Sequence, residues 1–133
     1  MIIVSPTLVY LFGLSTGRPT QTRAIAIYPF ILVRSRDVIE PWILNHEKIH
    51  LQQQRELLII GFFILALVEA LYALIYKRSP LFETYLWQSA EQEAFLNQNN
   101  FEYLKTRKMW SQFQYLKKKH KFSVSSRGVV TVL

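Results

Sequence analysis

The chain has 133 residues, of which half are hydrophobic and 14% are aromatic, so it can bury the core of one domain and is not globally disordered. It contains no cysteine, which excludes a disulfide framework, a thiolate metal site and a cysteine nucleophile. Residues 1–102 carry 8 Lys and Arg against 9 Asp and Glu, whereas residues 103–133 carry the other 8 basic residues and no acidic one. The net charge of +7 therefore belongs to the C-terminal part.

Residues 1–14 are apolar and have no basic residue ahead of their apolar part, so we expect no secretory signal. We interpret them as a core strand or packing segment, with an uncleaved membrane-proximal anchor as the alternative. Residues 8–12 and 24–33 are short runs rich in Val, Ile, Tyr and Phe, which is typical of strands joined by a loop. Pro29 in the second run favours an edge position or a bulge.

A helix is predicted from Pro41, which suits a first helical turn, through the good helix formers that continue to Leu58. The run 57–76 is 20 residues long and apolar except for Glu69, which is the length of a membrane span. For Glu69 we expect an ion pair or a helix-end contact with solvent, with a place in the functional pocket as the alternative. Residues 77–80, Lys-Arg-Ser-Pro, then break the pattern.

A long helical pattern follows over residues 82–119 and is predicted to be interrupted near residues 97–100. Residues 122–133 are predicted to be frayed or to form a late strand. Between residues 103 and 121, seven Lys and Arg are interleaved with aromatic residues. We interpret these residues as a solvated helix end whose aromatic side chains pack inward, with an anionic membrane surface as the alternative and nucleic acid disfavoured.

Residues 45–50 read Asn-His-Glu-Lys-Ile-His and contain His-Glu-x-x-His on the first predicted helix. Residues four positions apart lie on the same face of a helix, about one turn from each other. His46 and His50 can therefore bind the same metal ion. Glu47 falls beside them, where a carboxylate can take a proton from metal-bound water. The pattern therefore predicts a zinc site, and a polar helix face without metal is the alternative.

Residues 89–95 read Ser-Ala-Glu-Gln-Glu-Ala-Phe on a later predicted helix, and Glu91 lies 41 residues after His50. With these two motifs the chain resembles the gluzincins, metallopeptidases that combine His-Glu-x-x-His with a glutamate ligand from a downstream helix. Several gluzincin families show Glu-x-Glu-Ala-Asp, with the first glutamate on the metal. The resemblance implies that Glu91 is the third zinc ligand and Glu93 a neighbour.

The chain departs from that family pattern at Phe95, which stands where the family has an aspartate that often steadies a histidine ligand. Another group must orient His46 or His50, or that support is absent. By position, the candidates are Asn45, Tyr103 and Arg107, and a purely structural role is expected for each.

Two other glutamates compete for the role of third ligand. Glu56 occupies the place of the third metzincin ligand, but those enzymes leave the helix at a glycine where this chain has Gln53. In an unbroken helix Glu56 points away from His50. Glu93 lies on nearly the opposite helix face from Glu91, so only one of that pair can face the metal. We therefore favour Glu91.

A single membrane span over residues 57–76 and this zinc site exclude each other, because a 20-residue helix is about 30 Å long and would separate His50 from Glu91. A turn near Gly61 removes the conflict. We therefore predict a helix break at residues 60–62, with one helix over 41–59 and a second over 62–77 that returns antiparallel.

Together these patterns predict a predominantly helical α+β fold, minimal and zincin-like, with a small N-terminal β element followed by about four helices. Residues 1–121 are expected to form a single metallohydrolase domain, and 122–133 a tail. The expected function is zinc-dependent hydrolysis of peptide bonds, with zinc held by two histidines and Glu91. Glu47 would be the general base and then proton donor, and the strand around 24–33 would pair with an extended peptide.

The expected partners are a peptide or protein substrate and, peripherally, an anionic membrane, while the sequence does not indicate an oligomeric state. We expect a cytoplasmic location, with membrane association as the alternative. Two rival functions stay open. One is a non-catalytic protein that keeps the metal site for stability or partner binding, and the other is a membrane-anchored interaction protein with a span at 57–76 and no metal.

Overall fold

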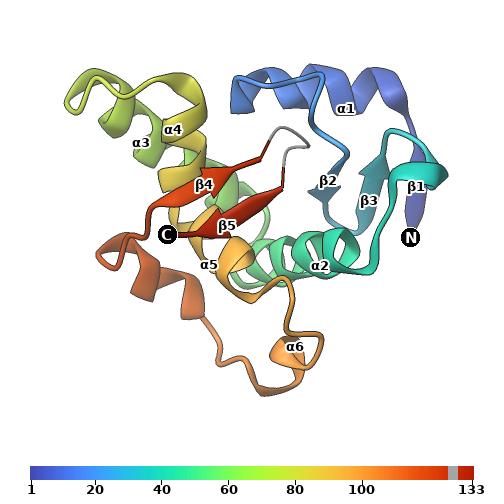
Figure 1. Ribbon diagram of the computed structural model, residues 1–133. Helices are drawn as coiled ribbons and strands as arrows, with labels where there is room; N and C mark the ends of the chain where they lie inside the picture. Colours follow the sequence, from blue (N-terminus) through green and yellow to red (C-terminus); the bar gives the residue numbers. More distant parts are fainter. Residues whose placement is uncertain (126–128) are drawn as a thin grey trace.

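The computed structural model describes residues 1–125 and 129–133 and shows a predominantly helical α+β protein, as predicted (Figure 1). Residues 126–128 of the predicted tail lie outside the described residues. In chain order the elements are β1 (Ile2–Val4), α1 (Pro6–Gly13), η1 (Leu14–Thr16), β2 (Ala24–Ile27), β3 (Phe30–Val33), η2 (Arg36–Val38), α2 (Pro41–Glu56), α3 (Ile60–Ile75), α4 (Leu81–Trp87), α5 (Ser89–Asn97), α6 (Tyr103–Thr106), η3 (Ser111–Leu116), β4 (Phe122–Val124) and β5 (Val130–Val132).

The N-terminal strands form a sheet in the order β1-β3-β2, with β1 parallel and β2 antiparallel to β3. Strands β2 and β3 are joined by Tyr28 and Pro29, so Pro29 lies in the turn rather than inside a strand. Ala24, Val33 and other sheet residues pack against Ile43 of α2 to form the apolar core. This packing covers one face of the sheet with α2 and leaves β2 as an edge strand.

The strand predicted over residues 8–12 is wrong, because these residues lie in α1. Pro6 occupies the first turn, and Ser5 Oγ accepts a hydrogen bond from Leu8 N at 3.4 Å. A capping side chain and a proline at this position both start a helix, and they outweigh the strand preference of Val9 and Tyr10. The strand of this region is β1, which precedes the cap.

The helix that carries the histidines breaks as the zinc hypothesis requires, although three residues earlier than predicted. Residues 57–59 separate α2 from α3, and Gly61 lies within α3. Leu58 and Ile59 both have positive φ. This conformation is strained for the β-branched Ile59. The two helices are bent by 107° at this break, so α3 does not return antiparallel.

Among the described residues, no single helix is both long and apolar enough to cross a membrane. Only α2 and α3 taken as a bent pair meet that test, by length and composition. The 20-residue span considered for residues 57–76 is therefore not one straight helix.

The long helix predicted over residues 82–119 is several shorter pieces. The interruption predicted at 97–100 is present, but the chain also turns at Gln88, whose φ of −58° and ψ of 140° lie outside the helical region. The C-terminal end forms the hairpin β4–β5, which corresponds to the late strand rather than the frayed end. The hairpin lies beside α5 (Figure 1).

Glu69 of α3 fixes the N-terminus of α5, the helix that carries Glu91. Its carboxylate is buried and accepts hydrogen bonds from Ser89 N at 3.1 Å and from Ser89 Oγ at 2.9 Å. Lys119 Nζ lies 3.5 Å from the same carboxylate. A carboxylate at a helix N-terminus satisfies free N–H groups and interacts favourably with the helix dipole. Glu69 therefore makes the ion pair expected of it, whereas the expected contact with solvent at a helix end is replaced by a buried contact with the N-terminus of α5.

Replacing Glu69 by alanine should destabilise the protein, because the buried N–H and hydroxyl of Ser89 lose their acceptor. We expect Glu69→Ala to lower the free energy of unfolding by about 2–3 kcal/mol, measured by urea titration. The control Glu102→Ala removes an exposed ion pair with Lys105 and should change it by less than about 0.5 kcal/mol. Equal effects of the two substitutions would contradict this role of Glu69.

Candidate metal centre

The site is built on a polar face of α2 that is buried between β2 and α5 (Figure 1). A small protein usually buries apolar side chains on such a helix face, whereas polar side chains are costly to bury without partners. The buried polar residues of α2 are Asn45, His46, Glu47, His50, Gln53 and Gln54. All six have hydrogen-bond or charge partners, which together define the site.

His46, His50 and Glu91 lie together, with one ligand atom from each within 4.8 Å of the others. The Nε2 atoms of the two histidines are 3.1 Å apart, and they lie 3.2 and 3.3 Å from the Glu91 carboxylate oxygens. Ligands of a tetrahedral zinc ion at 2.0–2.1 Å are separated from one another by roughly 3.3 Å. The donor set and its spacing therefore fit a metal ion such as zinc.

Gln53 orients His50 and was not identified from the sequence. Its Oε1 lies 2.8 Å from His50 Nδ1, while its Nε2 donates to Glu93 Oε2 at 2.8 Å. The Glu93 carboxylate only accepts hydrogen bonds, so the Gln53 amide must present its oxygen to the histidine. His50 then carries its proton on Nδ1 and keeps the Nε2 lone pair for a metal.

His46 receives the matching support from Gln98, which the sequence analysis also missed. Gln98 Oε1 lies 2.9 Å from His46 Nδ1, and Gln98 is 2% exposed. Asn45 holds the loop that carries Gln98, because its Nδ2 donates to the carbonyl oxygens of Gln98 and Asn100. Phe95 packs on the His46 ring with 4.6 Å between ring centroids.

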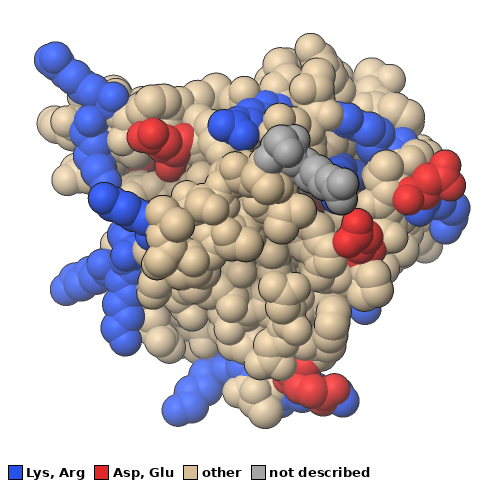
Figure 2. All heavy atoms as spheres, in the orientation of Figure 1, with Lys and Arg blue, Asp and Glu red and all other residues tan. Residues whose placement is uncertain are grey.

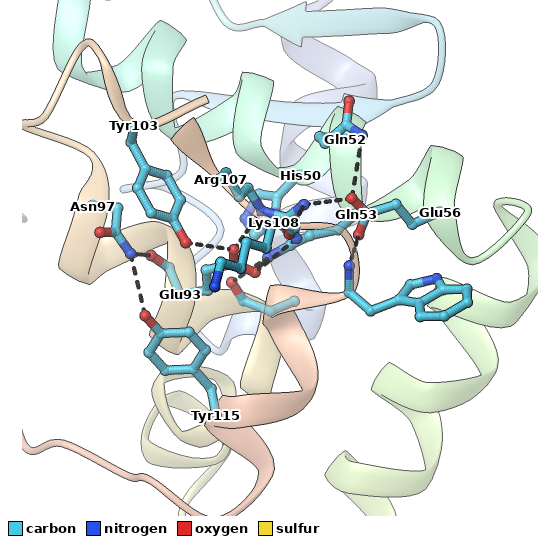
Figure 3. Close-up of polar contacts among 12 residues, drawn as sticks. His50, Gln52, Gln53, Glu56, Glu93, Asn97, Tyr103, Arg107, Lys108 and Tyr115 are labelled. Carbon is cyan, nitrogen blue, oxygen red and sulfur yellow. Dashed lines mark hydrogen bonds and ion pairs between the residues drawn. The ribbon is translucent and has the colours of Figure 1, made fainter. Parts of the chain in front are cut away.

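A buried ion-pair network behind the histidines joins α2 and α5 to the segment around Arg107 (Figure 3). The Arg107 guanidinium pairs with both Glu93 and Glu56, and the Tyr103 hydroxyl donates to Glu93 Oε1 at 2.9 Å. Tyr103 and Arg107 thus reach His50 only through Glu93 and Gln53. Glu56 and Glu93 belong to this network rather than to the group around the two histidines, as the preference for Glu91 requires.

Glu47 lies against the edge of the sheet next to the histidine pair. Its carboxylate accepts a hydrogen bond from the main-chain N–H of Ala26, while Gln54 Nε2 donates to the Ala26 carbonyl at 2.9 Å. Burial raises the pKa of Glu47 above its usual value, although the two histidines act in the opposite direction. A carboxylate with a raised pKa is suited to accepting a proton and then releasing it.

The histidines and Glu91 influence one another's protonation in the metal-free protein. Burial alone would lower the pKa of His50, but the adjacent Glu91 carboxylate raises it to about 9. Burial would raise the pKa of Glu91, yet the charge of His50 and hydrogen bonds from both histidines hold it well below its usual range. The site therefore favours an anionic carboxylate next to a cation, and a bound metal ion would replace the extra proton of His50 as that cation.

Two cavities meet at this group of residues. One of about 110 Å³ lies on the side of His46, and Val124 and Val130 of the C-terminal hairpin contribute to its wall. The other, of about 350 Å³, reaches His50 and Glu91. Glu47 and Tyr85 line both cavities.

Tyr85 is a further residue of the site that the sequence analysis missed. Burial raises the pKa of its hydroxyl well above 10, and the neighbouring Glu91, to which it is hydrogen-bonded, adds to that increase. The phenol therefore stays protonated, and in the metal-free protein its one O–H donates to the Glu91 carboxylate.

Removing the Gln98 side chain should weaken metal binding without removing a ligand, because it leaves His46 free to rotate. We expect Gln98→Ala to lower zinc affinity by roughly 10–100-fold, measured by competition with a chromogenic chelator. The control Gln114→Ala, at an exposed position of η3, should leave the affinity unchanged. Unaltered affinity in Gln98→Ala would show that the Gln98 contact does not support His46.

No model of a known protein family, no curated protein and no solved structure matches this chain.

Proposed function

We propose that this protein is a zinc-dependent hydrolase of the gluzincin type that cleaves peptide bonds. The observation that carries the proposal is the spacing of the three donor atoms of His46, His50 and Glu91, together with Glu47 beside them. A structural zinc site is usually closed by four protein ligands, whereas a catalytic one has three and keeps an open position. Here three donors face two cavities, which leaves space for a substrate.

The chemistry divides between the metal and the residues of the chain. A bound zinc ion would supply a Lewis acid that polarises the scissile carbonyl and makes water a better nucleophile at neutral pH. Glu47 takes one proton from the attacking water while the water oxygen bonds to the carbonyl carbon. When the carbon–nitrogen bond breaks, Glu47 gives that proton to the departing amine. Once Glu91 binds the metal, the Tyr85 hydroxyl would be free to donate its hydrogen bond to the carbonyl oxygen as that oxygen becomes negative.

The edge strand β2 offers a docking site for an extended peptide, at a more restricted position than the sequence predicts. The outward-facing N–H and C=O of Ala26 are occupied by Glu47 and Gln54. Residues two apart on a strand present their main-chain groups to the same edge, so Ala24 faces the same side. Ala24 lines both cavities and is thus the residue of β2 placed to pair with a substrate backbone.

The competing function is a metal site without catalysis, which keeps the protein folded or binds a partner. It is favoured by one observation, namely that Glu47 is 7% exposed and already accepts a hydrogen bond from Ala26. For catalysis, Glu47 must exchange or share that bond with water.

Replacing Glu47 by glutamine removes the proton acceptor and keeps the shape of the side chain. We expect Glu47→Gln to retain zinc and to lower the hydrolysis rate by roughly 10²–10⁴-fold, measured by mass spectrometry of a peptide-library digest. Glu83→Gln, at an exposed position of α4, is the matched control and should cleave like the wild type.

A Glu47→Gln variant that hydrolyses peptides like the wild type would contradict this mechanism. A zinc-loaded wild type that cleaves no peptide in the library would instead favour the non-catalytic function. Because zinc content is measured on the same samples, loss of activity through loss of the metal is recognised separately.

A further inference from the structure

Helices α1 and α3 expose an unusually apolar surface, which we name the α1–α3 face. Within Pro6–Gly13 and Ile60–Ile75 the only charged residue is Glu69, which is buried. The exposed apolar residues of the face are Leu8, Tyr10, Leu11 and Phe12 on α1 and Ile60, Phe63, Ile64, Leu67, Val68, Leu71, Tyr72, Leu74 and Ile75 on α3. A large apolar patch without charges marks a surface that contacts an apolar partner.

The larger of the two cavities opens onto this face. Its lining includes Phe12 of α1, Phe63 and Leu67 of α3, and Leu81 at the start of α4, all of them exposed. These side chains form an apolar rim at which α1 and α3 border the same opening. Deeper in, the cavity is lined by Glu47, His50 and Glu91. An apolar group that entered from the α1–α3 face would therefore reach the candidate metal centre directly.

Aromatic and basic residues gather at the C-terminal end of α3. The ring of Trp87 stacks on Tyr72 with 5.9 Å between centroids. The Nζ atoms of Lys77 and Lys119 lie 4.4 and 4.1 Å from the Trp87 ring centroid. Arg78 follows and is exposed. In Figure 2, Lys and Arg side chains project along the edge of the molecule where the end of α3 and the segment before β4 lie in Figure 1.

We propose that the α1–α3 face binds the surface of an anionic lipid bilayer and that the larger cavity receives an alkyl chain of a substrate held in that bilayer. Apolar helix faces lie in the interfacial region, and neighbouring aromatic and basic residues match its headgroups and their negative charge. This charge complementarity favours a bilayer over a second copy of this basic chain. The substrate class rests on the proposed function and is an amide whose scissile bond adjoins an alkyl chain.

The size of the cavity agrees with this class of ligand. At about 350 Å³ it falls within the range of roughly 300–1,000 Å³ that small-molecule sites occupy. Apart from the catalytic group, its lining is mostly apolar, with Phe62, Ala66 and Ala70 of α3 on one side and Ala26 of β2 on the other. An alkyl chain placed there loses its contact with water and keeps its amide end near Glu47.

Membrane binding is tested by flotation with vesicles of phosphatidylcholine alone or mixed with phosphatidylglycerol. We expect the wild type to float with the mixed vesicles. Ile64→Glu/Leu71→Glu adds charge to the face without touching the cavity lining and should lower the bound fraction by more than about tenfold. The matched control, Phe101→Glu/Met109→Glu, adds the same charge at exposed apolar positions outside α1 and α3 and should float like the wild type.

Equal flotation of the two double variants would overturn the bilayer-binding surface. It would also be overturned by a wild type that does not float and sediments as a dimer, because a second copy would then cover the face. Zinc content measured for every variant shows whether each is folded, so failed folding is not mistaken for lost binding.

The cavity is tested with the fluorescent fatty acid cis-parinaric acid, titrated without vesicles into zinc-loaded Glu47→Gln protein. Ala66→Phe in that background fills the cavity and should raise the Kd of the probe by about tenfold. Val68→Phe adds the same ring to an exposed position of α3 outside the cavity and should not change the Kd. Equal Kd values for Ala66→Phe and Val68→Phe, or no binding at all, would overturn the alkyl site.

These experiments distinguish a failure of the bilayer and alkyl-chain proposal from a failure of the proposed hydrolase function. Flotation and probe binding do not require turnover, so they would persist in a protein that binds zinc and never cleaves an amide. Conversely, a peptidase without a lipid-binding surface would cleave soluble peptides but would not float with either kind of vesicle. Its Kd for the probe would not change on Ala66→Phe.

Discussion

Gln53 joins the histidine pair to a buried ion pair, and the geometry of the site depends on this connection. Glu93 and the side chain of Arg107 are 0% and 1% exposed, and charges so buried are tolerated only when they are paired and hydrogen-bonded. Because Glu93 lies on α5 and Gln53 on α2, the hydrogen bond that Gln53 donates to the paired Glu93 carboxylate fixes the distance between the two helices. That distance places Glu91, two residues before Glu93, against the histidines.

The polar interior has consequences for the rest of the chain. The polar face of α2 packs against α5 and the edge of β2, and its apolar residues pack against the sheet. The break at residues 57–59 sends α3 away at 107°. As a result α3 packs one side on the protein, where Glu69 holds the N-terminus of α5, and exposes the other. The same arrangement therefore assembles the candidate metal centre and leaves an apolar surface beside it.

The parts of this arrangement that follow from local rules could be predicted from the sequence. His46 and His50 are four residues apart on one helix, only one of Glu91 and Glu93 can lie against both of them, and a metal site requires a break before α3. Residues 8–12 were assigned to a strand because their side chains favour one, whereas the cap at Ser5 starts a helix there.

Features created by contacts between distant segments were not predictable in this way. The turn at Gln88 follows from the capping of Ser89 by Glu69, 20 residues earlier. Gln98 reaches His46 only because Asn45 holds its loop, and Tyr85 enters the site from a helix that carries no motif. The contact of Gln53 with His50 was easier to predict, because Gln53 lies three residues after His50 and therefore on a neighbouring part of the same helix face.

Metal content is the most direct measurement of the central claim, that His46, His50 and Glu91 together hold a zinc ion. It is best determined by elemental mass spectrometry on protein purified without a His-tag or chelator. The His46→Ala and Glu91→Ala variants are measured in parallel. We predict about one zinc ion per wild-type chain and its loss in both variants. A wild type that holds no zinc and takes up none on addition, or a Glu91→Ala variant that keeps it unchanged, would contradict the account.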